Sequence, residues 1–105
     1  MENSDRRRHP RIGLLKAIAV AWSAAGAKTV SRSLSVSIGG LFITTPQPQA
    51  PGTCLQILVA TPVGEFRARA VVRNVRASAG MGIEFVAMQM QDRARLHQFL
   101  KQIPA

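Results

Sequence analysis

The chain has 105 residues, of which 47% are apolar and 18% are charged, so it holds enough apolar material for the core of one small domain. This composition excludes a wholly disordered polyelectrolyte, and the lack of any apolar run of about 18 residues argues against a transmembrane helix and against membrane insertion. Fourteen Lys and Arg residues against five Asp and Glu leave a net charge of +9, which indicates an anionic partner.

Residues 1–11 are polar and charged and show no apolar period, which predicts a flexible, Arg-rich arm ahead of a domain at 12–105. An Arg run followed by an apolar stretch has the outline of a signal peptide, but Lys16 and the alternation beyond it do not fit one. The single cysteine, Cys54, excludes an intrachain disulfide and fits a reducing compartment, so we expect a cytoplasmic protein.

Alternation of apolar and polar residues, bounded by Gly and Pro, predicts six short strands after the arm. They cover residues 18–22, 28–34, 41–45, 53–60, 65–76 and 81–87. In the fifth strand, Arg67, Arg69 and Arg73 alternate with apolar residues, so we expect these arginines on the solvent side. Cys54 lies beside Leu55 in the fourth strand, and we expect it to be a buried, inert thiol.

The last segment changes period and predicts an amphipathic helix at about 92–103. Its apolar residues follow the i, i+3, i+4, i+7 spacing: Leu96, Phe99, Leu100 and Ile103. Asp92 is expected to cap the N-terminus of this helix. The predicted fold is therefore all-β, a small six-stranded antiparallel β-barrel with a C-terminal helix packed over one open end.

No catalytic or metal-binding set stands out in the sequence. The two histidines, His9 and His97, have no further ligands at metal-binding spacing, and the few carboxylates are scattered. Gly39-Gly40 is followed by neither a Lys nor a helix, so it is not a phosphate-binding loop of the nucleoside triphosphatase kind. We therefore expect a protein that is not an enzyme and needs no metal and no cofactor.

Two segments remain that suit an anionic ligand. The first is the arm, whose planar guanidinium forks match phosphate oxygens and the guanine edge: Arg7, Arg8 and Arg11. The second supplies two hydroxyls on one side of an extended chain and two glycines that let backbone amides approach a ligand: Ser35, Ser37, Gly39 and Gly40.

These segments resemble the two ligand-binding motifs of the PilZ domain family, whose members are receptors for cyclic di-GMP. Arg7 and Arg11 match the R-x-x-x-R motif of the family, and Ser37 and Gly40 match the Ser and Gly of its [D/N]-x-S-x-x-G motif. The resemblance continues through the later strands and the terminal helix and covers nearly the whole chain. It implies a six-stranded barrel that binds cyclic di-GMP through both segments: Arg7, Arg8, Arg11, Ser35, Ser37, Gly39 and Gly40.

Ser35 departs from the family pattern, because it stands where the family has Asp or Asn. In the family, that side chain pairs with the edge of a guanine. By analogy with other base-edge contacts, losing such a pair costs about 1–3 kcal/mol, or about 5- to 150-fold in affinity. Since the arginines of the arm, Ser37 and Gly40 persist, we expect binding to be weakened but retained.

The resemblance implies a sensor whose arm is ordered by the ligand and thereby changes the surface offered to an unidentified downstream protein. Ser35 favours an alternative, a degenerate adaptor that keeps the barrel and acts through protein contacts without a nucleotide. A charge-driven nucleic-acid binder would need the arginines of the fifth strand, which are more simply its solvated side, so no specific nucleic acid is expected. Both a monomer and a homodimer are compatible with the sequence.

Overall fold

The structure is a computed structural model that describes residues 12–103. Within these residues the chain forms six strands and one helix, in the order β1 (Ile12–Ala24), β2 (Ala27–Val36), β3 (Gly40–Thr44), β4 (Cys54–Thr61), β5 (Gly64–Arg76), β6 (Gly80–Ala87) and α1 (Met90–Gln102).

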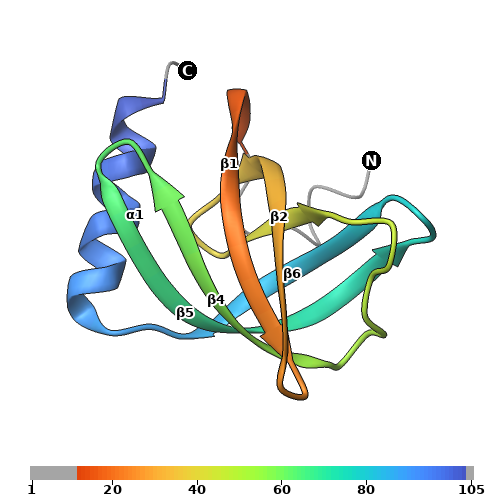
Figure 1. The fold of residues 1–105 in the computed structure, drawn as a ribbon. Coiled ribbons are helices and arrows are strands. Elements are labelled where there is room, and N and C mark those ends of the chain that lie inside the picture. The colour runs from red at the N-terminus through yellow and green to blue at the C-terminus, as the bar shows by residue number, and fades with distance from the viewer. Residues whose placement is uncertain (1–11, 104–105) are drawn as a thin grey trace, which may run out of the picture.

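The strands close into an antiparallel barrel in which the neighbours run β1-β2-β3-β6-β5-β4 (Figure 1). Tight turns join β1 to β2, β4 to β5 and β5 to β6, whereas a Pro-rich segment carries the chain from β3 to β4. The turn between β1 and β2 has positive φ angles at Ala25 and Gly26, of 52° and 85°. The predicted fold class, a six-stranded barrel followed by one helix, is confirmed.

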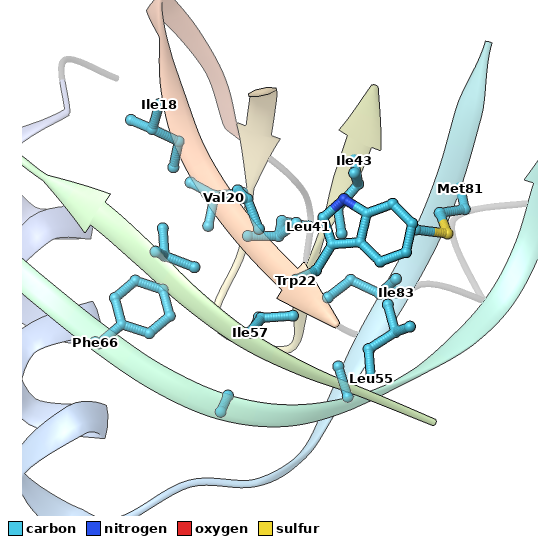
Figure 2. Close-up of a cluster of buried hydrophobic side chains, with 14 of the residues drawn as sticks. Ile18, Val20, Trp22, Leu41, Ile43, Leu55, Ile57, Phe66, Met81 and Ile83 are labelled. Carbon is cyan, nitrogen blue, oxygen red and sulfur yellow. The ribbon is translucent and has the colours of Figure 1, made fainter. Parts of the chain in front are cut away.

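The core fills the barrel with the inward-facing side chains of its strands (Figure 2). Every second residue is buried in β1 from Ile18 on, in β4, and in β5 up to Val72, as the alternation in the sequence predicts: Ile18, Val20, Trp22, Leu55, Ile57, Val59, Phe66, Ala68, Ala70 and Val72. The arginines between the buried residues of β5 are exposed, also as predicted. Burial of these apolar side chains is the main force that closes the barrel.

β2 departs from this pattern, because Ser31 and Ser33 face inward in its middle part and only Val36, at its end, adds an apolar side chain to the core. Ser33 is fully buried, and the Ser31 hydroxyl accepts a hydrogen bond of 3.0 Å from the Trp22 indole N–H. Val30 and Leu34 point to the outside of the barrel and are exposed. An indole N–H that enters the interior needs an acceptor, and the serine side of β2 supplies it.

β1 is longer than the predicted strand at 18–22. It begins at Ile12, and its pairing with β2 shifts register between Gly13 and Ile18. Such an irregularity breaks the two-residue period, so the first part of the strand carries no alternating signal in the sequence. The register places the start of β1 beside the end of β2, with Ile12 opposite Val36 and Gly13 opposite Ser35.

β3 and β6 approach each other closely because glycines occupy both ends of their ladder. A Cβ atom on Gly40 would overlap the carbonyl oxygen of Ile83, and one on Gly80 would overlap that of Ile43. Gly40 pairs with Glu84, and Gly80 pairs with Thr44. The absence of a side chain at Gly40 is therefore a requirement of strand packing.

The terminal helix α1 packs beside β5 and covers the adjacent end of the barrel (Figure 1). Leu96 and Phe99 are buried in the core cluster, and the Phe66 and Phe85 rings meet edge to face with centroids 6.0 Å apart. The described part of the chain contains no helix that is long and apolar enough to cross a membrane.

The predicted role of Asp92 as helix cap is wrong. α1 begins at Met90 after Gln89, whose side chain makes no capping hydrogen bond. Asp92 lies in the first turn and accepts a hydrogen bond of 2.8 Å from the backbone N–H of Arg67 in β5. This carboxylate therefore ties the helix to the barrel, a long-range contact that capping rules do not consider.

The prediction of a buried thiol at Cys54 is also wrong, because the thiol is exposed. It is the first residue of β4, and the next residue, Leu55, faces the core. Successive residues of a strand point to opposite faces, so burial of Leu55 directs Cys54 outward. The burial of a strand residue is therefore predicted by the two-residue period of the strand and not by an apolar neighbour in the sequence.

Replacing Asp92 by Ala removes the acceptor for the Arg67 N–H and is expected to lower the free energy of unfolding by about 1 kcal/mol. Asp92→Asn keeps an acceptor oxygen and is expected to cost less. Urea unfolding followed by circular dichroism measures both. Equal stability of Asp92→Ala and the parent chain would contradict a role for this bond in docking α1.

Gly40→Ala places a methyl group against the Ile83 carbonyl and is expected to destabilise the barrel by about 1–3 kcal/mol. Gly13→Ala is the matched control, because a Cβ atom there meets nothing within 4 Å. The urea midpoints of the two variants test the difference. If Gly40→Ala unfolds at the same urea concentration as Gly13→Ala, the close approach of β3 and β6 is not a constraint.

Candidate ligand-binding site

The turn between β2 and β3 is held by the side chain of Ser37. Its hydroxyl oxygen accepts hydrogen bonds from the N–H groups of Gly39 and Gly40, at 3.1 and 3.2 Å, and donates to the Gly40 carbonyl at 3.3 Å. The Ser37 N–H also donates to the Gly40 carbonyl, at 2.8 Å. Short polar side chains stabilise turns in this way, and the turn has one defined conformation as a result.

This arrangement changes the interpretation of the three turn residues. The sequence suggested that the Gly39 and Gly40 amides are free to approach a ligand, but both donate to the Ser37 hydroxyl. Ser37 itself is only 5% exposed. In this structure, the three residues shape the turn from within.

The turn is fixed to the barrel by β6. The Gly39 carbonyl accepts a hydrogen bond of 2.8 Å from the N–H of Phe85, and Gly40 continues directly into the ladder opposite Glu84. The turn is thus tied to a strand far away in the sequence, so its conformation depends on the closed barrel.

Ser35 lies near the end of β2, two residues before Ser37, and is half-buried. Ser33 donates its hydroxyl proton to the Ser35 carbonyl at 2.8 Å, which helps to fix the backbone of Ser35. Across the sheet, Ser35 faces Gly13, which has no side chain. A larger polar side chain at position 35 therefore has open space on the β1 side.

The structure brings four of the predicted site residues to one corner of the barrel: Ser35, Ser37, Gly39 and Gly40. The other three, Arg7, Arg8 and Arg11, lie outside the described residues, together with the rest of the predicted arm at 1–11. Ile12, the residue that follows Arg11, is part of this corner through its pairing with Val36.

Charged residues that the sequence analysis did not assign to the site lie next to this corner. Glu84 faces outward opposite Gly40 and accepts a hydrogen bond of 2.6 Å from Nε of Arg73. Further along the same outer face, the guanidinium carbon of Arg76 lies 5.6 Å from the centre of the Phe42 ring. Only the pairing of β3 with β6, which are not consecutive strands, reveals that Glu84 adjoins the turn.

The arginine face of β5 is divided in the structure. Arg67 and Arg69 line an open groove of about 560 Å³ between the barrel and the start of α1, together with Gln56, Gln89 and Asp92. Arg73 points to Glu84 instead. The described residues do not include a group of three or more His, Cys, Asp or Glu side chains suited to a metal ion.

Solved structures with the same fold include both isolated domains and longer proteins. MrkH from K. pneumonia in its apo state matches with a TM-score of 0.79 and 19% identity, over 93% of this chain and 52% of that chain. The PilZ domain of YcgR from Escherichia coli, solved with c-di-GMP, matches with a TM-score of 0.76 and 18% identity, over 93% and 91%.

The Bacillus subtilis inhibitor of motility MotI/DgrA matches with a TM-score of 0.71 and 17% identity, over 92% of this chain and 53% of that chain. The chain thus spans about half the length of MrkH and MotI/DgrA and nearly the whole of the YcgR domain. At these identities the likeness shows a common fold.

The sequence itself carries the family assignment. No curated protein is significantly similar to the chain. The model of the PilZ domain family, however, matches residues 5–102, a span that includes both predicted motifs and nearly the whole barrel and helix. The chain therefore belongs to the PilZ domain family.

Proposed function

We propose that this chain is a receptor for cyclic di-GMP that binds the nucleotide between its Arg-rich arm and the corner formed by Ser35 and the β2–β3 turn. The observation that carries the proposal is the pairing of Ile12 and Gly13 with Val36 and Ser35. It attaches the segment that bears Arg7, Arg8 and Arg11 beside the second motif. Arg7 lies five positions before Ile12, so the arm has a reach of at most about 18 Å from this corner.

The chemistry of the two segments complements a dinucleotide dianion. Guanidinium forks bind phosphate oxygens and the guanine edge in a bidentate manner, which suits Arg7 and Arg11, with Arg8 adding a further cation. The backbone around Ser37, Gly39 and Gly40 supplies a turn of fixed shape for the other side of the ligand. The PilZ domain of YcgR and MrkH were both solved in complex with c-di-GMP, which supports this ligand class.

In the proposal, the ligand orders the arm across the barrel and so alters the surface presented to a downstream protein, a disorder-to-order switch. The protein performs no chemistry on the nucleotide and needs no cofactor. Its role is to convert a nucleotide concentration into a change of protein contact.

Ser35 supports a second candidate function, an adaptor that acts through protein contacts without nucleotide. A serine hydroxyl is short and uncharged, so it cannot accept hydrogen bonds from two guanine donors as a carboxylate does. The two candidates differ in a single measurable quantity, the affinity of the natural chain for cyclic di-GMP.

Isothermal titration calorimetry with cyclic di-GMP is expected to show binding by the natural chain and about 5- to 150-fold tighter binding by Ser35→Asp. Arg7→Ala and Arg11→Ala should each abolish the heat of binding. Arg93→Ala, which removes an exposed arginine of α1, should leave it unchanged. The natural chain would instead be the nucleotide-independent adaptor if it gives no heat at about 100 μM while Ser35→Asp binds.

Glu84→Gln removes a negative charge beside the turn and releases Arg73 from its ion pair, so it is expected to raise the affinity for the dianion. The pair is about half exposed, so the expected gain is about 1.5- to 5-fold and shrinks as salt is added. Glu65→Gln, at the far end of β5, is the control with the same change of net charge. Equal effects of the two substitutions would show that Glu84 lies outside the field of the ligand.

A further inference from the structure

The outer side of β2 carries apolar side chains with no cover from the described residues. Val30 is 73% exposed and Leu34 is 54% exposed. Lys28 and Arg32 alternate with them on the same side. Isolated apolar residues are normal on protein surfaces, but here Ser31 and Ser33 face inward while Val30 and Leu34 face outward, and Val36 at the end of the strand faces the core. This reversal of the usual pattern requires an explanation.

Intrinsic strand propensity does not account for the outward position of Val30 and Leu34. Valine is a good strand former, but leucine gains little over a polar β-branched residue at an exposed strand position. The inward serines have partners, since Ser31 accepts the Trp22 indole N–H and Ser33 bonds the backbone of Ser35, but no contact inside the barrel requires apolar residues on the outer side. The outward valine and leucine are therefore explained best by an external partner.

β1, the strand beside β2, contributes only small side chains next to Val30 and Arg32 on the outer side of the sheet. Val30 lies opposite Ala21 of β1, and Arg32 lies opposite Ala19. On the far side of β1, Ala19 is paired with Ala60 of β4. Small side chains in the middle of a sheet allow another backbone to approach closely. Helix α1 packs beside β5 and not beside β1 and β2 (Figure 1).

We propose that this surface binds an amphipathic helix of a partner protein whose apolar stripe is flanked by Asp and Glu. We name it the β2 docking face and define it by Ala19, Ala21, Lys28, Val30, Arg32 and Leu34. The helix would lie over the alanines of β1 and bury Val30 and Leu34. Lys28 and Arg32 would extend their aliphatic stems past the apolar contact and place their charges against the flanking carboxylates.

The spacing of the two anchors suits a helix. Val30 and Leu34 are four residues apart on one strand, about 13 Å. Eight residues of α-helix rise about 12 Å, so apolar residues spaced i, i+4, i+8 reach both anchors. The apolar anchors give affinity, and the two cations select an acidic partner over other amphipathic helices.

The positive charge of the β2 docking face disfavours binding of a second copy of this chain there. The chain has a net charge of +9, and the β2 docking face contains two cations and no carboxylate, so two copies would place like charges together. A membrane surface is also disfavoured, because the face lacks the Trp or Tyr side chains that anchor proteins at the bilayer interface. An acidic helix satisfies both the apolar and the charged residues.

This inference rests on the proposed function only in that a receptor needs a protein partner, and its test uses no nucleotide. A failure therefore leaves the calorimetric result with cyclic di-GMP untouched. The probe is a synthetic helical peptide with leucines at i, i+4 and i+8 and glutamates on both flanks, added to the uniformly ¹⁵N-labelled full chain. Backbone amide shifts in two-dimensional NMR spectra then locate the contact.

Binding is expected to perturb the amides of residues 19–21 and 28–34 and to weaken as salt is added. The double variant Val30→Thr with Leu34→Thr should lower the affinity about tenfold or more. The matched control, Val75→Thr with Val86→Thr, changes two valines that are 38% and 47% exposed elsewhere and should bind as the natural chain does. Equal loss in both variants, shifts elsewhere, or no binding would overturn the proposal.

A charge exchange tests the choice of partner independently of the apolar anchors. Lys28→Glu with Arg32→Glu should lose the glutamate-flanked peptide and gain a peptide with lysines on its flanks. Sedimentation of the chain alone and co-sedimentation with phosphatidylserine vesicles complete the test. Self-association or vesicle binding that Val30→Thr with Leu34→Thr abolishes would assign the face to a second copy or to a membrane and would overturn the proposal.

Discussion

The close approach of β3 to β6 at Gly40 is the constraint on which the candidate site depends. With no side chain at this position, the β3 backbone lies against the Ile83 carbonyl, and the preceding turn is drawn onto β6 through the Gly39 carbonyl. Ser37 then closes the turn from within. The corner beside Ser35 is thus a product of barrel closure, and its shape is set before any ligand arrives.

β2 connects the two surfaces that we propose. Ser35 lies near its C-terminal end at the nucleotide corner, and the adjacent Leu34 belongs to the β2 docking face. The pairing of β2 with β3 shifts register between Arg32 and Val36, so these two neighbouring residues lie in an irregular part of the strand. In the two proposals, one strand therefore carries a ligand contact and a partner contact at adjacent residues.

Most of the fold could be predicted from the sequence, because strong alternation marks the strands whose apolar residues face inward. Ile18, Val20 and Trp22 illustrate this, as does β5 from Phe66 to Val72. The facing of β2 could not be predicted, since its inner side is defined by a hydrogen bond to an indole from another strand. The start of β1 was missed because its register shift hides the two-residue period.

The sequence predicts the candidate site only as two motifs. Spacing identified Ser35, Ser37, Gly39 and Gly40, but only the hydrogen bonds show that the glycine amides serve the turn. Asp92 and Glu84 act across non-consecutive elements, so their partners depend on topology that local patterns do not contain. The basic residues likewise lie in different surroundings. Arg73 forms an ion pair, Arg67 and Arg69 line a groove, and Lys28 and Arg32 belong to the β2 docking face.

An NMR titration of the ¹⁵N-labelled full chain with cyclic di-GMP tests the central claim most directly, because it reports both binding and position. The account predicts that the amides of residues 12–13 and 35–40 shift together with those of the arm, and that Arg11→Ala abolishes the shifts. Shifts confined to the groove beside Arg67 and Arg69, or none at all at saturating nucleotide, would contradict it.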